Sequence, residues 1–170
     1  MADGVGTHRR RPLQIASSSF SSDGHRAALA HLGRFGGALA LLGVGIDHID
    51  QYWADSYSAI PTIGTLFALN FVSATFVGLG LLAPVRRLTG RWADAALALL
   101  AVSGIGIATG ALAGLLISER SGLFGLMEQG YRSAIVLSIV LEVATVILLG
   151  TFLAENGLGI RLRDGRIRPR

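Results

Sequence analysis

The sequence predicts an all-α integral membrane protein, a four-helix bundle with both termini in the cytoplasm. Hydrophobic residues make up 51% of the 170 residues, and the mean hydropathy of +0.55 is high for a chain of this length. No charged residue occurs in 56–85 or in 95–118, and each run exceeds the roughly 18 to 20 residues that a helix needs to cross the hydrocarbon core. The arginines also flank these runs unequally, and this inequality sets the orientation.

The first half of the chain contains a tail and two spans. Residues 1–30 are basic and Ser-rich, which is typical of a disordered cytoplasmic tail. The first span is expected at 31–52, with Arg34 reaching toward one interface. A short polar loop then leads to Pro61, which favours the first turn of a helix, and the second span is expected at 62–83.

The second half contains two more spans. A basic turn at 84–91 precedes the third span, expected at 93–118. After a second loop, the fourth span is expected at 133–154, where Glu142 is the only charged residue. Residues 155–170 form a basic tail. Because a backbone in lipid must satisfy its own hydrogen bonds, these Gly-rich apolar runs are predicted to be helices.

The arginines predict orientation, location and partners. Thirteen of the fifteen lie on the tails, the first interface and the central turn, whereas only Arg120 and Arg132 lie on the other side. Cytoplasmic loops carry this excess, so both termini are expected on the cytoplasmic side of the inner (plasma) membrane. The expected partners of the basic tails are anionic lipid headgroups of the bilayer, and no nucleic acid is expected.

Polar residues inside three spans are expected at one depth. Asn70, Thr109 and Glu142 each lie roughly 12 to 14 Å below the same boundary, from a rise of about 1.5 Å per residue. An ionisable group at this depth costs about 2.5 to 3.5 kcal/mol and usually faces a partner or a cavity. Two interpretations follow: an interhelical hydrogen bond that holds the bundle together, which is favoured, and a proton or ligand site.

A second polar group lies at the outer end of the first span. It consists of Asp47, His48, Asp50 and Gln51, and the two aspartates share a helix face. Two carboxylates near an imidazole could bind a divalent cation or relay protons. Adjacent residues point in different directions, however, so a solvated helix end is favoured and no metal is predicted.

No cofactor is predicted. The chain has no Cys, which excludes disulfides, Cys-ligated zinc and iron–sulfur clusters. His31 and His48 are the only histidines in the membrane zone, and about 25 Å of helix separates them, so they cannot bind one haem iron. We find no P-loop, G-x-S-x-G, H-E-x-x-H or dinucleotide-binding motif.

The third span contains small residues at a regular spacing. Gly106, Gly110 and Gly114 form a doubled G-x-x-x-G, which allows close approach between membrane helices. Packing within the bundle is favoured over packing against another copy or a membrane partner.

These observations favour a non-enzymatic accessory or binding protein of the membrane. One alternative is a proton-coupled small-molecule carrier that uses Glu142. Another is a membrane enzyme with its site at the outer hairpin, which would need a second group opposite His48.

The chain resembles a group of small actinobacterial integral membrane proteins of uncharacterised function. The resemblance covers residues 34–154 and implies no activity. The residues that carry it are His48, Tyr52, Tyr57, Ile60–Gly64, Leu66–Asn70, Leu123–Glu128 and Glu142. A fainter similarity to DoxX-like four-helix proteins lies in the Gly-rich first span and Arg34.

The arginine distribution generates a prediction about topology. Reporter fusions after Arg26, Arg87 and Arg170 should report a cytoplasmic location, and fusions within 54–58 and 119–129 should report an external one. An external signal at Arg87 would contradict the four-span topology.

Overall fold

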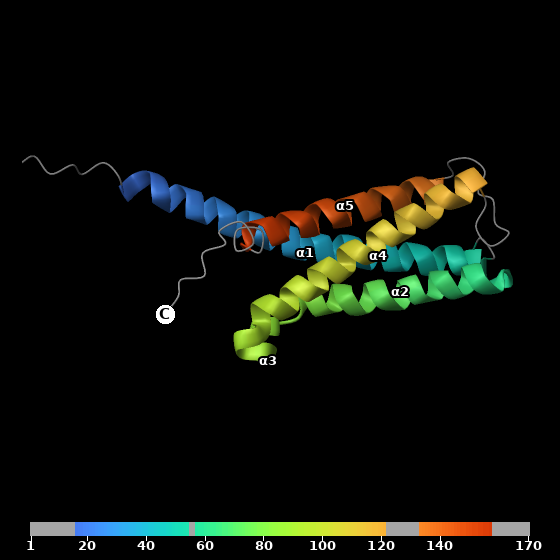
Figure 1. Cartoon of the computed structure of the whole chain (residues 1–170), viewed down its shortest axis with the longest axis horizontal. Helices are drawn as coiled ribbons and strands as arrows, with labels where there is room; N and C mark the ends of the chain where they lie inside the picture. Colours follow the sequence, from blue (N-terminus) through green and yellow to red (C-terminus); the bar gives the residue numbers. More distant parts are fainter. Residues whose placement is uncertain (1–15, 55–56, 122–132, 158–170) are drawn as a thin grey trace, which may run out of the picture.

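The computed structural model describes residues 16–54, 57–121 and 133–157, and these are helical apart from short turns (Figure 1). The elements in chain order are α1 (Ala16–Ala54), η1 (Tyr57–Ala59), α2 (Pro61–Leu82), α3 (Val85–Thr89), η2 (Gly90–Trp92), α4 (Ala93–Ser121) and α5 (Ser133–Glu155). Four helical segments are long and apolar enough to cross a membrane. The predicted all-α architecture with four membrane-length helices is confirmed.

The helix boundaries differ from the predicted ones mainly at the start of α1. The ends of α2, α4 and α5 lie within three residues of the predicted ends. By contrast, α1 begins at Ala16, inside the segment predicted to be a disordered tail, and its first turns project beyond the bundle (Figure 1). Extending an existing helix costs far less than starting one, and no proline interrupts residues 16–54. The predictions for residues 1–15, 122–132 and 158–170 lie outside the described residues.

Helix α1 is the central element of the bundle. It packs along both α2 and α5, while α4 packs against α5 and, over a shorter length, against α2. The approach of α1 to α5 depends on Gly33, because a Cβ atom there would lie 2.7 Å from the backbone oxygen of Leu148 and 2.8 Å from the backbone nitrogen of Phe152. No side chain can be added at that position without moving one of the two helices.

The apolar core fills one end of the bundle, which we call the α3 end. Here the middle of α1, the end of α2, the start of α4 and the end of α5 meet, next to the short helix α3. The buried core residues are Ala38, Leu41, Ala74, Val77, Leu81, Val85, Ala93, Leu97, Ala101, Leu149 and Phe152. The opposite end, where η1 joins α1 to α2, is the hairpin end.

Helix α4 moves away from α2 as it runs toward the hairpin end (Figure 1). Near the α3 end, a Cβ atom at Gly80 of α2 would lie 3.1 Å from Leu100 of α4. Farther along α4, a Cβ atom at Gly106 or Gly110 would meet nothing within 4 Å. The prediction that this glycine stripe packs against a helix of the bundle is therefore wrong at Gly106 and Gly110, because α4 has by then crossed from α2 to α5.

Arg34 fixes the end of α2. Its guanidinium donates from Nε to the carbonyl oxygen of Leu81 and from an Nη atom to that of Ala83, both at 2.7 Å. The last carbonyls of a helix have no partner within the helix, so Arg34 satisfies that of Leu81. It adds a second hydrogen bond to that of Ala83, which also accepts from the backbone nitrogen of Val85 at 2.8 Å. The chain then turns through α3 and reaches η2 at Gly90, whose φ of 51° favours glycine.

The Arg34 contact generates a stability prediction. Arg34→Leu should lower the free energy of unfolding by about 1 to 3 kcal/mol, because it removes two hydrogen bonds from a charged donor. Thermal unfolding in detergent measures the change. The matched control is Arg86→Leu: Arg86 contacts Asp94 at 3.4 Å on the surface, where such pairs contribute little. Equal melting temperatures for Arg34→Leu and the wild type would contradict the proposed role of Arg34.

Candidate functional site

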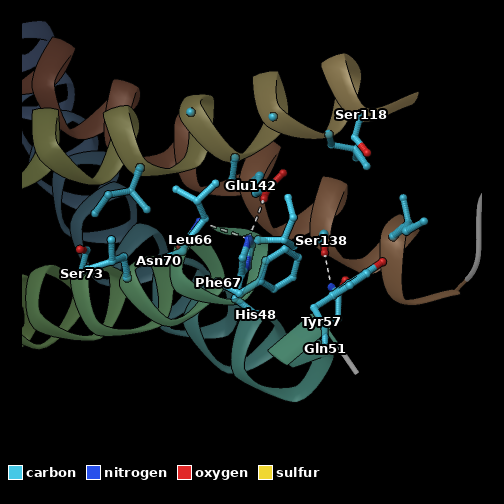
Figure 2. A pocket seen from close by; sticks show the side chains of 18 of the residues that line it. His48, Gln51, Tyr57, Leu66, Phe67, Asn70, Ser73, Ser118, Ser138 and Glu142 are labelled. Carbon is cyan, nitrogen blue, oxygen red and sulfur yellow. Dashed lines mark hydrogen bonds and ion pairs between the residues drawn. The ribbon is translucent and has the colours of Figure 1, made fainter. Parts of the chain in front are cut away.

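A pocket of about 350 Å³ occupies the hairpin half of the bundle, between α2, α4 and α5, with α1 behind it (Figure 2). Its walls are mainly apolar and include Leu66, Phe67 and Leu115. The separation of α4 from α2 creates this space, and Gly106 and Gly110 of α4 line it. The hairpin half of the bundle therefore contains a pocket, whereas the α3 end contains the packed apolar core.

Adjacent residues of α1 face two different helices. Asp47 and His48 are 7% and 8% exposed, and they point about 100° apart around the helix axis. Asp47 contacts α5, whereas His48 contacts α2 and the pocket. The prediction of a solvated helix end is therefore wrong for these two residues. Asp50 is exposed, so the predicted carboxylate pair does not share one environment.

Asp47 belongs to a closed set of hydrogen bonds between α1 and α5. The hydroxyl of Ser138 donates to Oδ2 of Asp47. The amide Nε2 of Gln51 donates to the same carboxylate oxygen at 2.7 Å and to Oγ of Ser138 at 2.9 Å. All three side chains are buried. These contacts join the two helices, which is the structural role that the sequence had suggested for Glu142.

His48 is held in one tautomer when its ring is neutral. Its Nδ1 lies 2.9 Å from the carbonyl oxygen of Val44, which can only accept, so Nδ1 carries the hydrogen. Nε2 then has a free lone pair and accepts from Nδ2 of Asn70 at 3.2 Å (Figure 2). The ring also packs against Phe67, with 5.0 Å between the centroids. Contacts with Val44, Asn70 and Phe67 therefore fix the orientation of the imidazole.

Glu142 is buried beside His48 without full hydrogen bonding. The residue is 2% exposed, and its Oε1 lies 4.0 Å from Nε2 of His48, beyond hydrogen-bond distance (Figure 2). Two buried side-chain atoms have no hydrogen-bond partner among the described residues, namely Oε2 of Glu142 and Oδ1 of Asn70. Both residues line the pocket. Buried polar atoms in proteins rarely lack a partner, so these two oxygens are the places where the pocket can accept hydrogen bonds.

The predicted polar layer is only partly assembled. Asn70 and Glu142 both reach His48, but Thr109 is exposed and its hydroxyl bonds to the carbonyl oxygens of Ile105 and Gly106 in its own helix. The prediction that Thr109 joins the layer is wrong, because equal depth does not place residues on facing sides of their helices. Ser138 was missed, although it lies four residues before Glu142 on the same face of α5.

The polar groups are not arranged as a metal centre in the part of the chain that the structure describes. No three His, Cys, Asp or Glu side chains group together there. No protein-family model, curated protein or solved structure matches the chain. The function must therefore be inferred from the geometry of the pocket.

The two carboxylates should respond differently to removal. Asp47→Leu should lower the free energy of unfolding by about 1 to 2 kcal/mol, because Ser138 and Gln51 lose their acceptor in a membrane setting. Glu142→Leu should leave it unchanged or raise it, because it removes an incompletely bonded buried carboxyl group. Chemical or thermal unfolding in detergent measures both. A larger loss of stability in Glu142→Leu than in Asp47→Leu would show that Glu142 is the structural residue.

Proposed function

We propose that the protein is a non-enzymatic, four-span plasma-membrane protein that binds a small, mainly apolar molecule in the pocket beside His48. The observation that carries this proposal is the pair of unpartnered buried oxygens on Asn70 and Glu142 at the pocket wall. A bundle held together by a polar layer alone would satisfy both. The volume also falls within the roughly 300 to 1,000 Å³ range of small-molecule sites, and a few polar groups among apolar walls are typical of them.

The ligand would reach the site between α2 and α4. Gly106 and Gly110 are exposed at this opening and add no side chain that could block it. In the proposed orientation, with both termini cytoplasmic and the arginine-rich turn inside, the pocket lies in the outer half of the membrane. The resemblance to small actinobacterial membrane proteins is consistent with this proposal, but it does not identify the ligand.

The bonding of His48 argues against the enzyme alternative. Glu142 and Asn70 converge on the imidazole, as that alternative required, but both ring nitrogens are already engaged with Val44 and Asn70. The hydroxyl of Ser138 donates to Asp47 rather than to the imidazole, so Ser138 and His48 do not form a nucleophile–base pair.

The second candidate function is a proton-coupled carrier, favoured by the distance of 4.0 Å between His48 and Glu142. A proton on Nε2 of His48 would displace the amide nitrogen of Asn70, because two donors cannot face each other, and would favour contact with Glu142. Ligand release would then depend on this proton. Ligand-driven proton movement in proteoliposomes that is abolished by Glu142→Gln would support the carrier, and its absence from the wild type would exclude it.

Filling the pocket should abolish ligand binding. Gly110→Phe places a ring into the pocket, where a Cβ atom meets nothing within 4 Å, and should reduce binding of 4-phenylbutanol at least tenfold. The control is Gly150→Phe, which also has open space at its Cβ atom but does not line the pocket. Equilibrium dialysis of the probe against protein nanodiscs, corrected with empty nanodiscs, measures binding. Equal binding by the wild type and Gly110→Phe would contradict the proposed function.

A further inference from the structure

We propose that the polar end of the ligand is a primary or secondary ammonium group, bound by Glu142 and Asn70. This inference rests on the proposed function and adds the chemical class of the ligand. It follows from the hydrogen-bonding capacity, the charge and the aromatic surface that the pocket offers.

The site offers two buried hydrogen-bond acceptors to a ligand when Glu142 is ionised. The Nδ1 hydrogen of His48 is used by Val44, and the amide nitrogen of Asn70 already donates to Nε2 of His48. Among the described residues, the buried side-chain atoms without a hydrogen-bond partner are Oδ1 of Asn70 on α2 and Oε2 of Glu142 on α5. A ligand that satisfies both oxygens must therefore donate at least two hydrogen bonds.

The charge of the pocket favours a cation. No arginine lines it in the described part of the chain, which leaves an ionised Glu142 without a basic partner while His48 is neutral. Asp47 adds a second carboxylate on the neighbouring face of α1. A buried carboxylate is costly unless it is paired with a positive charge, and an ammonium group supplies that charge.

The aromatic residues of the pocket suit the same head group. Phe67 and Tyr57 both line it, with their ring centroids 4.8 Å apart. Aromatic faces attract cations and also pack against an apolar ligand body. An alcohol would supply one donor and no charge, and a quaternary ammonium would supply charge without an N–H donor. A primary or secondary ammonium supplies both.

Three probes with the same apolar body separate these head groups. We would measure 4-phenylbutylamine, 4-phenylbutanol and trimethyl(4-phenylbutyl)ammonium by equilibrium dialysis against nanodiscs that contain the protein, corrected with empty nanodiscs of identical lipid. The amine should bind at least tenfold more tightly than either of the other two. Equal binding of the amine and the alcohol would overturn the ammonium proposal while leaving the pocket intact.

Two variants test whether the preference for the amine arises from Glu142. Glu142→Gln should weaken binding of the amine at least tenfold and leave binding of the alcohol within twofold, because the amide keeps the shape and removes the charge. Thr109→Val is the matched control, since Thr109 is exposed, does not line the pocket and bonds to carbonyl oxygens of its own helix. Glu142→Gln must melt within a few degrees of the wild type.

A parallel loss of amine and alcohol binding in Glu142→Gln would overturn the ammonium proposal. If none of the probes showed saturable binding, the proposed function would be overturned as well.

Discussion

The arrangement of the polar side chains depends on the cost of burying a polar group without a hydrogen-bond partner. Helix α1 supplies such groups from the centre of the bundle, because α2 and α5 flank it on two sides. One residue step of about 100° turns Asp47 toward α5 and His48 toward α2. Asp47 completes its hydrogen bonds with Gln51 and Ser138. On the other face of α1, His48 lines the pocket, where Oε2 of Glu142 has no hydrogen-bond partner among the described residues.

The apolar core lies at the α3 end, whereas the proposed binding site lies at the hairpin end, next to the hydrogen bonds of Asp47. At the α3 end, the apolar core, the close approach at Gly33 and the Arg34 contact hold the helices together. At the hairpin end, α4 has left α2, and the space between them is the pocket. Binding sites commonly retain polar groups that do not contribute to folding, and Glu142 fits that pattern.

The sequence predicted the ends of α2, α4 and α5 to within three residues, because hydropathy, span length and Pro61 are local properties of the chain, but it missed the first fifteen residues of α1. It also identified His48, Asn70 and Glu142, since a polar residue inside a span is costly wherever it lies. It failed where the answer depends on rotation about a helix axis. Thr109 has the predicted depth but faces outward, and Ser138, which bonds to Asp47, was overlooked. The glycine stripe of α4 could not be assigned without knowing the crossing of the helices, which is a property of the whole bundle.

Asp47 is expected to hold α1 and α5 together, whereas Glu142 is expected to be available to a ligand. Double-mutant cycles in detergent distinguish these two roles by comparing the coupling of Asp47 with Ser138 and that of Glu142 with His48. We expect a coupling free energy of about 1 kcal/mol for the first pair, as for hydrogen bonds between membrane helices, and a value near zero for the second. A strong coupling between Glu142 and His48 with none between Asp47 and Ser138 would contradict these roles.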